Sequence, residues 1–163
     1  MVFSKLFGRS KAADFPPPHP DSPVEIVGDV HGCADLLDAL PAPEPGCLRI
    51  FVGDIVDRGP DSRAVIDRLR DFEAAGLGRC LMGNHEAMML DFLDGPETSG
   101  LHWIRNGGLE TLLSYGVALE DPRAEPPVLR TACEAFRAAL GAETEAWLRA
   151  RPLLWRSGNL VVT

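Results

Sequence analysis

The sequence predicts an α/β fold built on a parallel sheet, and three observations support this prediction. Three short apolar runs each end in a glycine followed by a polar residue, at Gly28-Asp29, Gly53-Asp54 and Gly83-Asn84. Short apolar runs bounded by glycine are typical of buried parallel strands. Segments with helical spacing of apolar residues separate the runs, and the intervals of 25 and 30 residues between the three polar positions match the length of a βαβ unit.

The first elements follow in order along the chain. Strands are predicted at residues 24–27, 49–52 and 79–82. The first helix is predicted at residues 34–40 and ends there because Pro41 cannot continue it. The second is predicted at residues 61–75, where apolar residues share one face and charged residues the other, and Gly76 ends it.

The second half of the sequence is predicted to be mostly helical. Helices are predicted at residues 87–93, 109–115, 131–140 and 143–149. Pro152 ends the last of them. Two apolar runs, at residues 153–155 and 160–162, flank Gly158-Asn159 and predict a hairpin.

The chain divides into two parts by composition. Residues 1–23 are predicted to be a flexible, proline-rich leader. Five prolines lie between positions 16 and 23, and each removes a backbone donor and fixes φ. Residues 24–163 have the size and the apolar content of a single domain with its own core.

Charge and cysteine content exclude several classes of protein. The formal net charge is −8, which argues against a nucleic acid partner because phosphate backbones require a basic surface. The four cysteines are scattered without a CxxC pair, so a disulfide framework is not predicted and a reducing cytoplasm is the expected location. No apolar run is long enough to span a membrane, and no membrane partner is expected.

Six polar side chains follow the three predicted strands, where the functional loops of a parallel sheet lie. They are Asp29, His31, Asp54, Asp57, Asn84 and His85. Their nitrogen and oxygen ligands favour Mn, Fe or Zn, and a carboxylate such as Asp54 can bridge two ions. A single Gly-Asp at the end of a strand is usually a simple turn, but three such motifs together favour a metal site.

Three segments resemble the signature motifs of a known family. They are Gly28-Asp29-Val30-His31-Gly32, Gly53-Asp54-Ile55-Val56-Asp57-Arg58-Gly59 and Gly83-Asn84-His85-Glu86. The set is similar to the motifs of calcineurin-like metallophosphoesterases, in the phosphoprotein phosphatase branch that includes bacterial and phage serine/threonine protein phosphatases. The resemblance implies a β-sandwich flanked by helices, in four layers α/β/β/α, of which this chain would hold the N-terminal portion.

The resemblance also implies a role for each motif residue. Asp29 and His31 would bind one divalent metal ion, Asp54 would bridge two ions, and Asn84 would bind the second. Manganese is the expected metal, with iron or zinc as alternatives. The nucleophile would be a metal-bound hydroxide.

Three further residues complete the implied site. His85, oriented by Asp57, would donate a proton to the leaving oxygen, and Arg58 would hold phosphate oxygens with its planar fork. The alternative for Arg58 is a simple ion pair with Asp61. Glu86 is expected to be structural, holding the loop or capping the helix.

The likeness extends from residue 24 to residue 163 and includes His102-Trp103-Ile104-Arg105-Asn106-Gly107-Gly108. Trp103 alone is interpreted as a core residue, and His102 as a packing or substrate-groove residue. In the family, the strand resembling residues 160–163 leads into a His-Ala-Gly motif, followed by a later Gly-His, and both supply metal ligands. The sequence ends before these motifs, so we expect a truncated product, an incomplete gene model or a shortened chain.

Three hypotheses for function follow. The first is a two-metal phosphoric ester hydrolase that acts on phosphoserine or phosphothreonine in proteins, or on another phosphate ester. The second is a symmetrical dinucleoside tetraphosphate hydrolase, which resembles the same motifs. The third is a catalytically inactive remnant that binds a metal ion, phosphate or a partner, because removing metal ligands lowers activity strongly.

Overall fold

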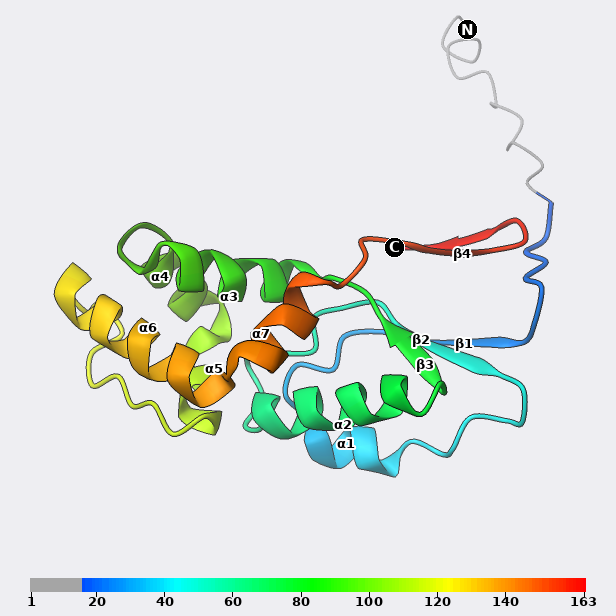
Figure 1. Cartoon of the computed structure of the whole chain (residues 1–163), viewed down its shortest axis with the longest axis horizontal. Coiled ribbons are helices and arrows are strands. Elements are labelled where there is room, and N and C mark those ends of the chain that lie inside the picture. The colour runs from blue at the N-terminus through cyan, green and yellow to red at the C-terminus, as the bar shows by residue number, and fades with distance from the viewer. Residues whose placement is uncertain (1–15) are drawn as a thin grey trace, which may run out of the picture.

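The structure is a computed structural model that describes residues 16–163, and it contains a parallel three-stranded sheet. The strands are β1 (Val24–Val27), β2 (Leu48–Phe51) and β3 (Gly78–Cys80), in the order β1-β2-β3. Helices α1 (Ala34–Ala39) and α2 (Ser62–Ala74) connect them and lie below the sheet in the view of Figure 1. The predicted α/β class with a parallel sheet is confirmed.

The alternation of side chains along β2 gives the sheet two apolar faces. Phe51 points to the helices and belongs to the main core, whereas Ile50 belongs to a smaller cluster on the opposite face. The antiparallel hairpin of β4 (Trp155–Ser157) and β5 (Leu160–Val162) covers that face, as Figure 1 shows. Val162 of the hairpin packs with Ile50 and Leu81. The described chain therefore has three stacked layers: helices, sheet and hairpin.

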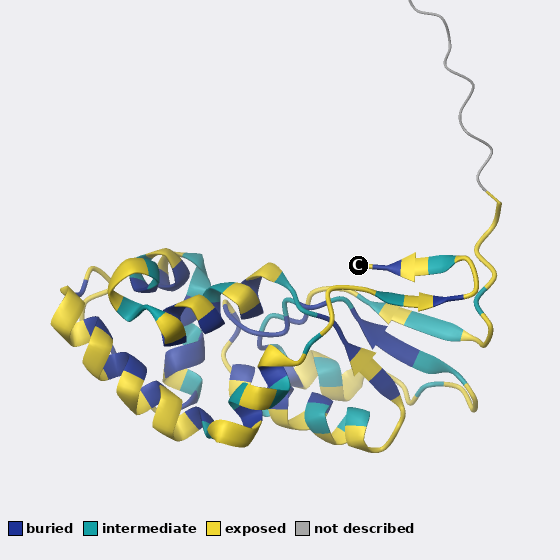
Figure 2. Cartoon of the chain, turned by 45° about the horizontal axis from the view of Figure 1, so that its top comes forward, coloured by how far each residue is buried: buried dark blue, intermediate teal, exposed yellow. Residues whose placement is uncertain are grey.

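The remaining helices form a second block beside the sheet (Figures 1 and 2). They are α3 (Asn84–Asp94), α4 (Pro96–Trp103), the π-type turn η1 (Ile104–Gly108), α5 (Leu109–Ser114), α6 (Pro126–Leu140) and α7 (Ala142–Arg149). Pairs α3 with α4 and α4 with α6 pack closely against each other. Buried residues line the inner faces of these helices, and exposed residues line their outer faces (Figure 2).

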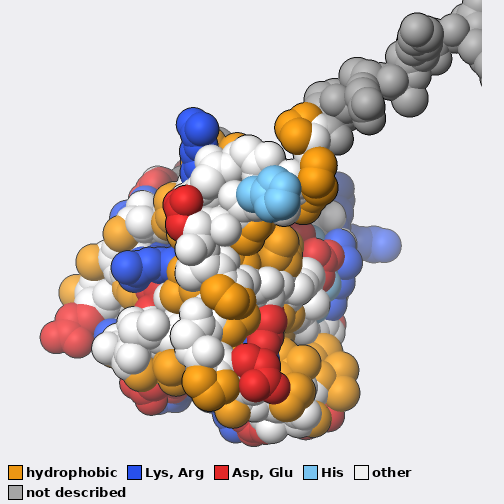
Figure 3. All heavy atoms as spheres, turned by 90° about the vertical axis from the view of Figure 1, so that its right-hand side faces the viewer, with side chains coloured by type: hydrophobic (Ala, Val, Ile, Leu, Met, Phe, Trp, Pro, Cys, Tyr) orange, Lys and Arg blue, Asp and Glu red, His pale blue; other side chains and the backbone are white. Residues whose placement is uncertain are grey.

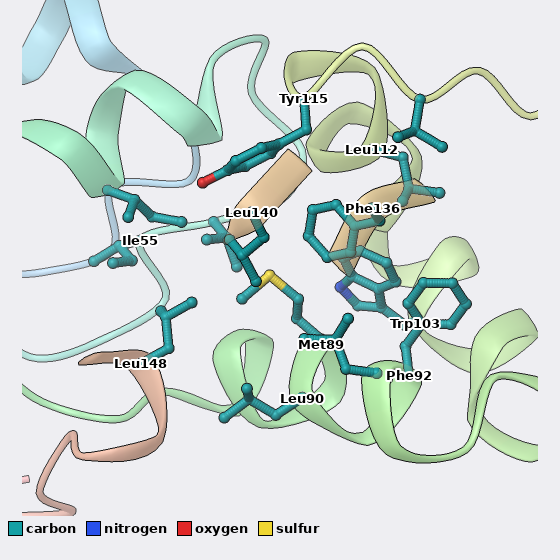
Figure 4. Packing of buried hydrophobic residues seen from close by; sticks show 14 of the residues in the cluster. Ile55, Met89, Leu90, Phe92, Trp103, Leu112, Tyr115, Phe136, Leu140 and Leu148 are labelled. Atoms are coloured by element: carbon teal, nitrogen blue, oxygen red, sulfur yellow. The ribbon is translucent and has the colours of Figure 1, made fainter. Parts of the chain in front are cut away.

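An aromatic cluster holds this block together. The rings of Trp103, Phe92 and Phe136 form a triangle, with centroid distances of 4.9 Å from Trp103 to Phe92, 5.7 Å from Trp103 to Phe136 and 6.5 Å from Phe92 to Phe136. Tyr115 meets Phe136 edge to face at 5.3 Å. Figure 4 shows these rings around Met89, with Leu112 beside them. Large rings bury much apolar surface, so this cluster fixes the positions of α3, α4 and α6 relative to one another.

Several element boundaries differ from the prediction. β3 ends at Cys80 rather than at Met82, because Met82 donates its backbone N–H to Pro152 O at 2.9 Å, outside the parallel ladder. Helix α6 begins at Pro126, five residues before the predicted start at residue 131, since prolines are well tolerated at the first helical positions. Helix α4 and the turn η1 were not predicted.

The end of the predicted leader lies against the hairpin turn. Residues 1–15 of that leader lie outside the described residues. Asn159 accepts the backbone N–H of His19 and donates to Pro17 O at 3.0 Å. Asp21 accepts the Gly158 N–H at 3.0 Å and donates its own N–H to the Ser157 hydroxyl at 2.8 Å. At this end of the molecule, hydrophobic, acidic and basic side chains are interspersed (Figure 3).

Within residues 16–163, no helix combines the length and the apolar character that a bilayer crossing requires.

Candidate metal and catalytic site

The loops that follow β1, β2 and β3 converge at the carboxyl edge of the sheet. The backbone N–H groups of Val30 and His31 both donate to Asp54 O, at 3.1 and 2.9 Å, and Gly32 N–H donates to Ile55 O at 2.9 Å. The first two predicted motifs are therefore joined by backbone hydrogen bonds. The third motif opens α3, whose first residue is Asn84.

Three glycines allow these loops to touch. A Cβ atom on Gly53 would collide with the backbone of Gly83, and one on Gly83 would collide with Asp54. A Cβ atom on Gly59 would collide with the carbonyl oxygen of His31. Any larger residue at these positions would force the three motifs apart.

Backbone strain is concentrated in the same loops. Within residues 16–163, four residues other than glycine have positive φ, namely His31 (45°), Asp54 (50°), Asp57 (71°) and Arg58 (66°). Residues with side chains rarely adopt this conformation, and such outliers gather at functional sites.

The His31 imidazole is oriented for ligand binding. Its Nδ1 lies 2.9 Å from Val56 O, a carbonyl that can only accept, so Nδ1 carries the proton and Nε2 keeps its lone pair. The Oδ2 atom of Asp29 lies 3.5 Å from that Nε2. A carbonyl that fixes the tautomer of a histidine is a common feature of metal sites.

The donor set fits divalent metal ions. Ligand atoms of His31, Asp54 and His85 all lie within 4.8 Å of one another. His31 and Asp54 are predicted ligands, whereas His85 was predicted to be the proton donor. The remaining predicted ligands, Asp29 and Asn84, are exposed at the same edge of the sheet. The set offers imidazole nitrogen, carboxylate oxygen and amide oxygen, which suits Mn, Fe or Zn. Cysteine sulfur takes no part in this cluster of the described residues.

His85 and Asp57 form a buried pair beside this cluster. His85 Nδ1 lies 2.8 Å from Asp57 Oδ2, and both side chains are almost fully buried. Burial raises the pKa of the Asp57 carboxyl, while hydrogen bonds from Thr111, His85 and Trp103 act to lower it. The carboxylate fixes the tautomer of His85, so Nε2 is the atom that faces the loops.

Arg58 lies across the opening of the site. Its two terminal nitrogens lie 3.0 Å from His31 Nε2 and 3.1 Å from His85 Nε2. The guanidinium can only donate, so both imidazole nitrogens accept. The side chain is exposed and reaches into the site, which is not the geometry of the alternative interpretation as a partner of Asp61.

The Glu86 carboxylate holds the loop that follows β2 by accepting its backbone N–H groups. Its Oε1 accepts the N–H groups of Ile55 and Val56 at 2.9 and 3.2 Å. Its Oε2 accepts those of Asp54 and Gly83 at 2.8 and 2.9 Å. Burial raises the pKa of this carboxyl, and the four N–H groups oppose that rise. The structural role expected for Glu86 agrees with these contacts.

Sequence reasoning missed three residues that surround Asp57. Trp103 Nε1 donates to both carboxylate oxygens at 3.1 and 2.9 Å, and Thr111 Oγ1 donates to Oδ1 at 2.7 Å. Ser62 Oγ and Thr111 Oγ1 each accept the Asp57 backbone N–H at 3.0 Å. Trp103 was interpreted as a core residue only. A buried indole N–H needs an acceptor, and that requirement was the available signal.

A family comparison agrees with this geometry. The model of the calcineurin-like phosphoesterase family matches residues 22–129, more than half of the chain. The matched segment contains all three motifs and the residues around Asp57.

Curated relatives carry two kinds of name. A symmetrical bis(5'-nucleosyl)-tetraphosphatase of Ralstonia nicotianae is 36% identical over 52% of this chain and 36% of its own length. Serine/threonine-protein phosphatase 1 of Salmonella typhimurium is 36% identical over 52% of this chain and 38% of its own. A symmetrical bis(5'-nucleosyl)-tetraphosphatase of Legionella pneumophila is 32% identical over 85% of this chain and 41% of its own.

A solved structure shares the fold. A crystal structure described as a putative diadenosine tetraphosphatase aligns with a TM-score of 0.54 at 24% identity, over 89% of this chain and 51% of that one. The chain thus spans between about a third and a half of the length of the proteins it matches.

Proposed function

The chain belongs to the calcineurin-like phosphoesterase family, and we propose that it carries the site of a two-metal phosphoric ester hydrolase. One observation supports this most strongly. Polar groups from three distant motifs meet at one edge of the sheet, where ligand atoms of His31, Asp54 and His85 lie within 4.8 Å of one another. A buried carboxylate–imidazole pair lies directly beside them.

The metal ions would be held by the strand-end residues. In this proposal Asp29 and His31 bind one ion, Asp54 bridges two, and Asn84 binds the second, with manganese as the expected metal. When bound, such ions polarise phosphoryl oxygens and lower the pKa of water. The fixed tautomer of His31 leaves its Nε2 free of a proton, as this role requires.

His85 and Arg58 would act on the substrate directly. In this proposal Arg58 turns from His85 Nε2 to the bound phosphate, and the imidazolium form of His85 then donates its Nε2 proton to the leaving oxygen. Asp57 stabilises that imidazolium through Nδ1. Arg58 binds two phosphate oxygens with its fork. Its guanidinium already lies within 3.1 Å of both imidazoles, so a phosphate held there would lie next to His85.

The first candidate substrate is a phosphorylated protein. The serine/threonine phosphatase of Salmonella supports this choice, as does the Asn106-Gly107-Gly108 segment. The second candidate is a dinucleoside tetraphosphate, because several of the matched relatives carry that name. A panel of phosphopeptides and dinucleoside polyphosphates distinguishes them. Faster turnover of the dinucleotide would overturn the first choice.

The test of the site itself uses the 163-residue chain. We expect Mn²⁺-dependent hydrolysis of 4-nitrophenyl phosphate that Asp54→Asn abolishes and Asp91→Asn leaves intact. Asp91 is exposed on α3 and far along the helix from the motifs, so it is a matched charge control. Calorimetric titration with Mn²⁺ accompanies the assay.

Three outcomes are informative. Turnover and metal binding that both depend on Asp54 support the proposal. Metal binding without turnover would favour the third hypothesis, a chain that binds metal but does not catalyse. Absence of both would overturn the proposed metal site.

A further inference from the structure

The segment from Trp103 to Thr111 supplies most of the side-chain donors around Asp57. Trp103 stands at the end of α4, and Thr111 stands in α5. Between them lies η1, which contains the Asn106-Gly107-Gly108 sequence noted as a family-like segment. Trp103 Nε1 and Thr111 Oγ1 both reach the same carboxylate oxygen, Asp57 Oδ1, at 3.1 and 2.7 Å.

A continuous α-helix does not bring these two side chains together. Residues eight positions apart in an α-helix are separated by about 12 Å along the axis and about 80° around it. The kink at Gly107, with φ of 106°, changes the direction of the chain between them.

The same turn also contacts Arg58. Gly107 O accepts the Arg58 backbone N–H at 3.1 Å. A Cβ atom on Gly107 would lie 2.8 Å from both the backbone N and the Cγ of Arg58. Arg58 has a positive φ of 66°, so this contact holds it in a strained conformation. A Cβ atom on Gly108 would collide with the Trp103 indole.

We propose that Trp103 and Thr111 are positioning residues for the His85–Asp57 pair. In this proposal the kinked turn η1 brings both side chains to the Asp57 carboxylate and also supports the backbone of Arg58. This role rests on the proposed function, in which His85 donates the proton. The donors hold Asp57 so that Oδ2 faces His85 Nδ1 at 2.8 Å. Without them, the buried carboxylate can rotate or move away, and the imidazole loses its fixed orientation.

Both carboxylate oxygens of Asp57 accept hydrogen bonds from these donors. Thr111 Oγ1 reaches Oδ1, while Trp103 Nε1 bridges both oxygens, so the plane of the carboxylate is fixed in two directions. Ser62 and Thr111 accept the backbone N–H of the same residue and fix its main chain. Asp57 is therefore held by groups from α2, α4 and α5 at once.

The first experiment reads the His85–Asp57 hydrogen bond without any catalysis. The probe is the far-downfield ¹H NMR signal of the His85 Nδ1–H, assigned by its loss in His85→Asn. We expect the signal in the parent chain and in Thr111→Ser, which keeps the hydroxyl. It should disappear or broaden in Thr111→Val, which has the same shape without the hydroxyl, and in Trp103→Phe.

Trp147→Phe is the control, because that indole bonds to Glu73, away from this site. An unchanged signal in Thr111→Val and in a folded Trp103→Phe overturns the proposal. So does the absence of the signal in the parent, since the pair would then not be formed. The threonine variants decide the matter even if Trp103→Phe does not fold.

The second experiment separates positioning from general damage to the fold. A proton donor matters most for esters with poor leaving groups. We expect Thr111→Val to lower kcat for phenyl phosphate by about ten- to a hundredfold while that for 2,4-dinitrophenyl phosphate falls far less. Equal losses with both esters contradict the proposal. If the parent shows no turnover, the proposed function fails, and the NMR result alone decides the positioning role.

Discussion

At the scale of single residues, the site is defined by strained backbone as much as by side chains. His31, Asp54, Asp57 and Arg58 have positive φ, a conformation that costs about 1–3 kcal/mol for a residue with a side chain. Such strain persists only where surrounding contacts hold it. Glu86 supplies one such contact, because its carboxylate accepts four backbone N–H groups around Asp54.

The substitution Glu86→Gln tests whether these four hydrogen bonds stabilise the loop. Glutamine keeps the shape but has one accepting oxygen, so one pair of backbone N–H groups would face an amide NH₂. A buried donor left without an acceptor costs about 1–3 kcal/mol, so the loss of two acceptors should lower the free energy of unfolding by about 2–6 kcal/mol. Urea denaturation measures the loss.

The control for this change is Glu134→Gln, on the exposed face of α6. That substitution should alter stability by less than about 0.5 kcal/mol. If the two variants lose the same small amount, the carboxylate of Glu86 does not hold the loop.

The sequence predicted which residues form the site, but it did not predict which side chains donate hydrogen bonds to Asp57. The glycine-bounded motifs identified Asp29, His31, Asp54 and His85 as neighbours, because parallel strands end at one edge of the sheet. The donors to Asp57 come from α4 and α5, distant in sequence. No local pattern links Trp103 or Thr111 to Asp57, so only the packed structure reveals that contact.

At the scale of elements, strands and amphipathic helices were predictable, and α4 was not. Its sequence contains Ser99-Gly100, which disfavours a helix locally. In the structure, Gly100 lies against Phe92 and Leu129, where a Cβ atom would come within 3.2 Å of the Phe92 ring. The glycine therefore allows α4 to approach α3 and α6 closely, and tertiary packing outweighs the weak local preference.

An ion pair joins the ends of α3 and α7. Arg149 donates to both oxygens of Asp94, at 3.0 and 2.6 Å. The hydrogen bonds from Arg149 lower the pKa of Asp94 below its ordinary value. A lowered pKa in the folded chain means that the pair stabilises the fold above the ordinary carboxyl pKa, and that this contribution is lost as pH falls through the folded value.

We therefore expect Asp94→Asn to cost stability at neutral pH and nothing in acid. Asp94 is more than half exposed, so solvent screening limits the cost to about 0.2–1 kcal/mol. Urea unfolding of the parent and the variant at neutral pH and well below the ordinary carboxyl pKa of about 3.9 measures the difference. A cost that persists unchanged in acid would contradict the role of the charge.

At the scale of the whole molecule, two cores of unequal size hold the described chain. The larger one joins the helix-facing side of the sheet to α2–α7 and includes Trp103, Phe92 and Phe136. The smaller one, between the sheet and the hairpin, has only Ile50, Leu81 and Val162 as fully buried members. Residues 17–21 add hydrogen bonds to the hairpin turn.

This inequality in buried apolar contact predicts that the site and the hairpin differ in local stability. The site loops rest on the larger core through His85, Glu86 and Trp103, whereas the hairpin depends on the smaller core. Local opening free energies follow the amount of buried apolar contact. We therefore expect backbone amides of β4 and β5 to exchange with solvent faster than those of β2 and α3. The hairpin should open while the loops of the site stay folded.

Val162→Ala sharpens this expectation into a test. Removing two buried methyl groups should lower the opening free energy of the hairpin by about 1–2 kcal/mol. Native-state hydrogen exchange should then show less protection in β4 and β5 and unchanged protection in β2 and α3. Val161→Ala is the matched control, because Val161 is 52% exposed on the same strand. If the hairpin opens separately, the loss of apolar contact at Val162 should lower protection only in β4 and β5. An equal loss of protection in every element would mean that the hairpin and the site unfold as one unit, which would contradict this expectation.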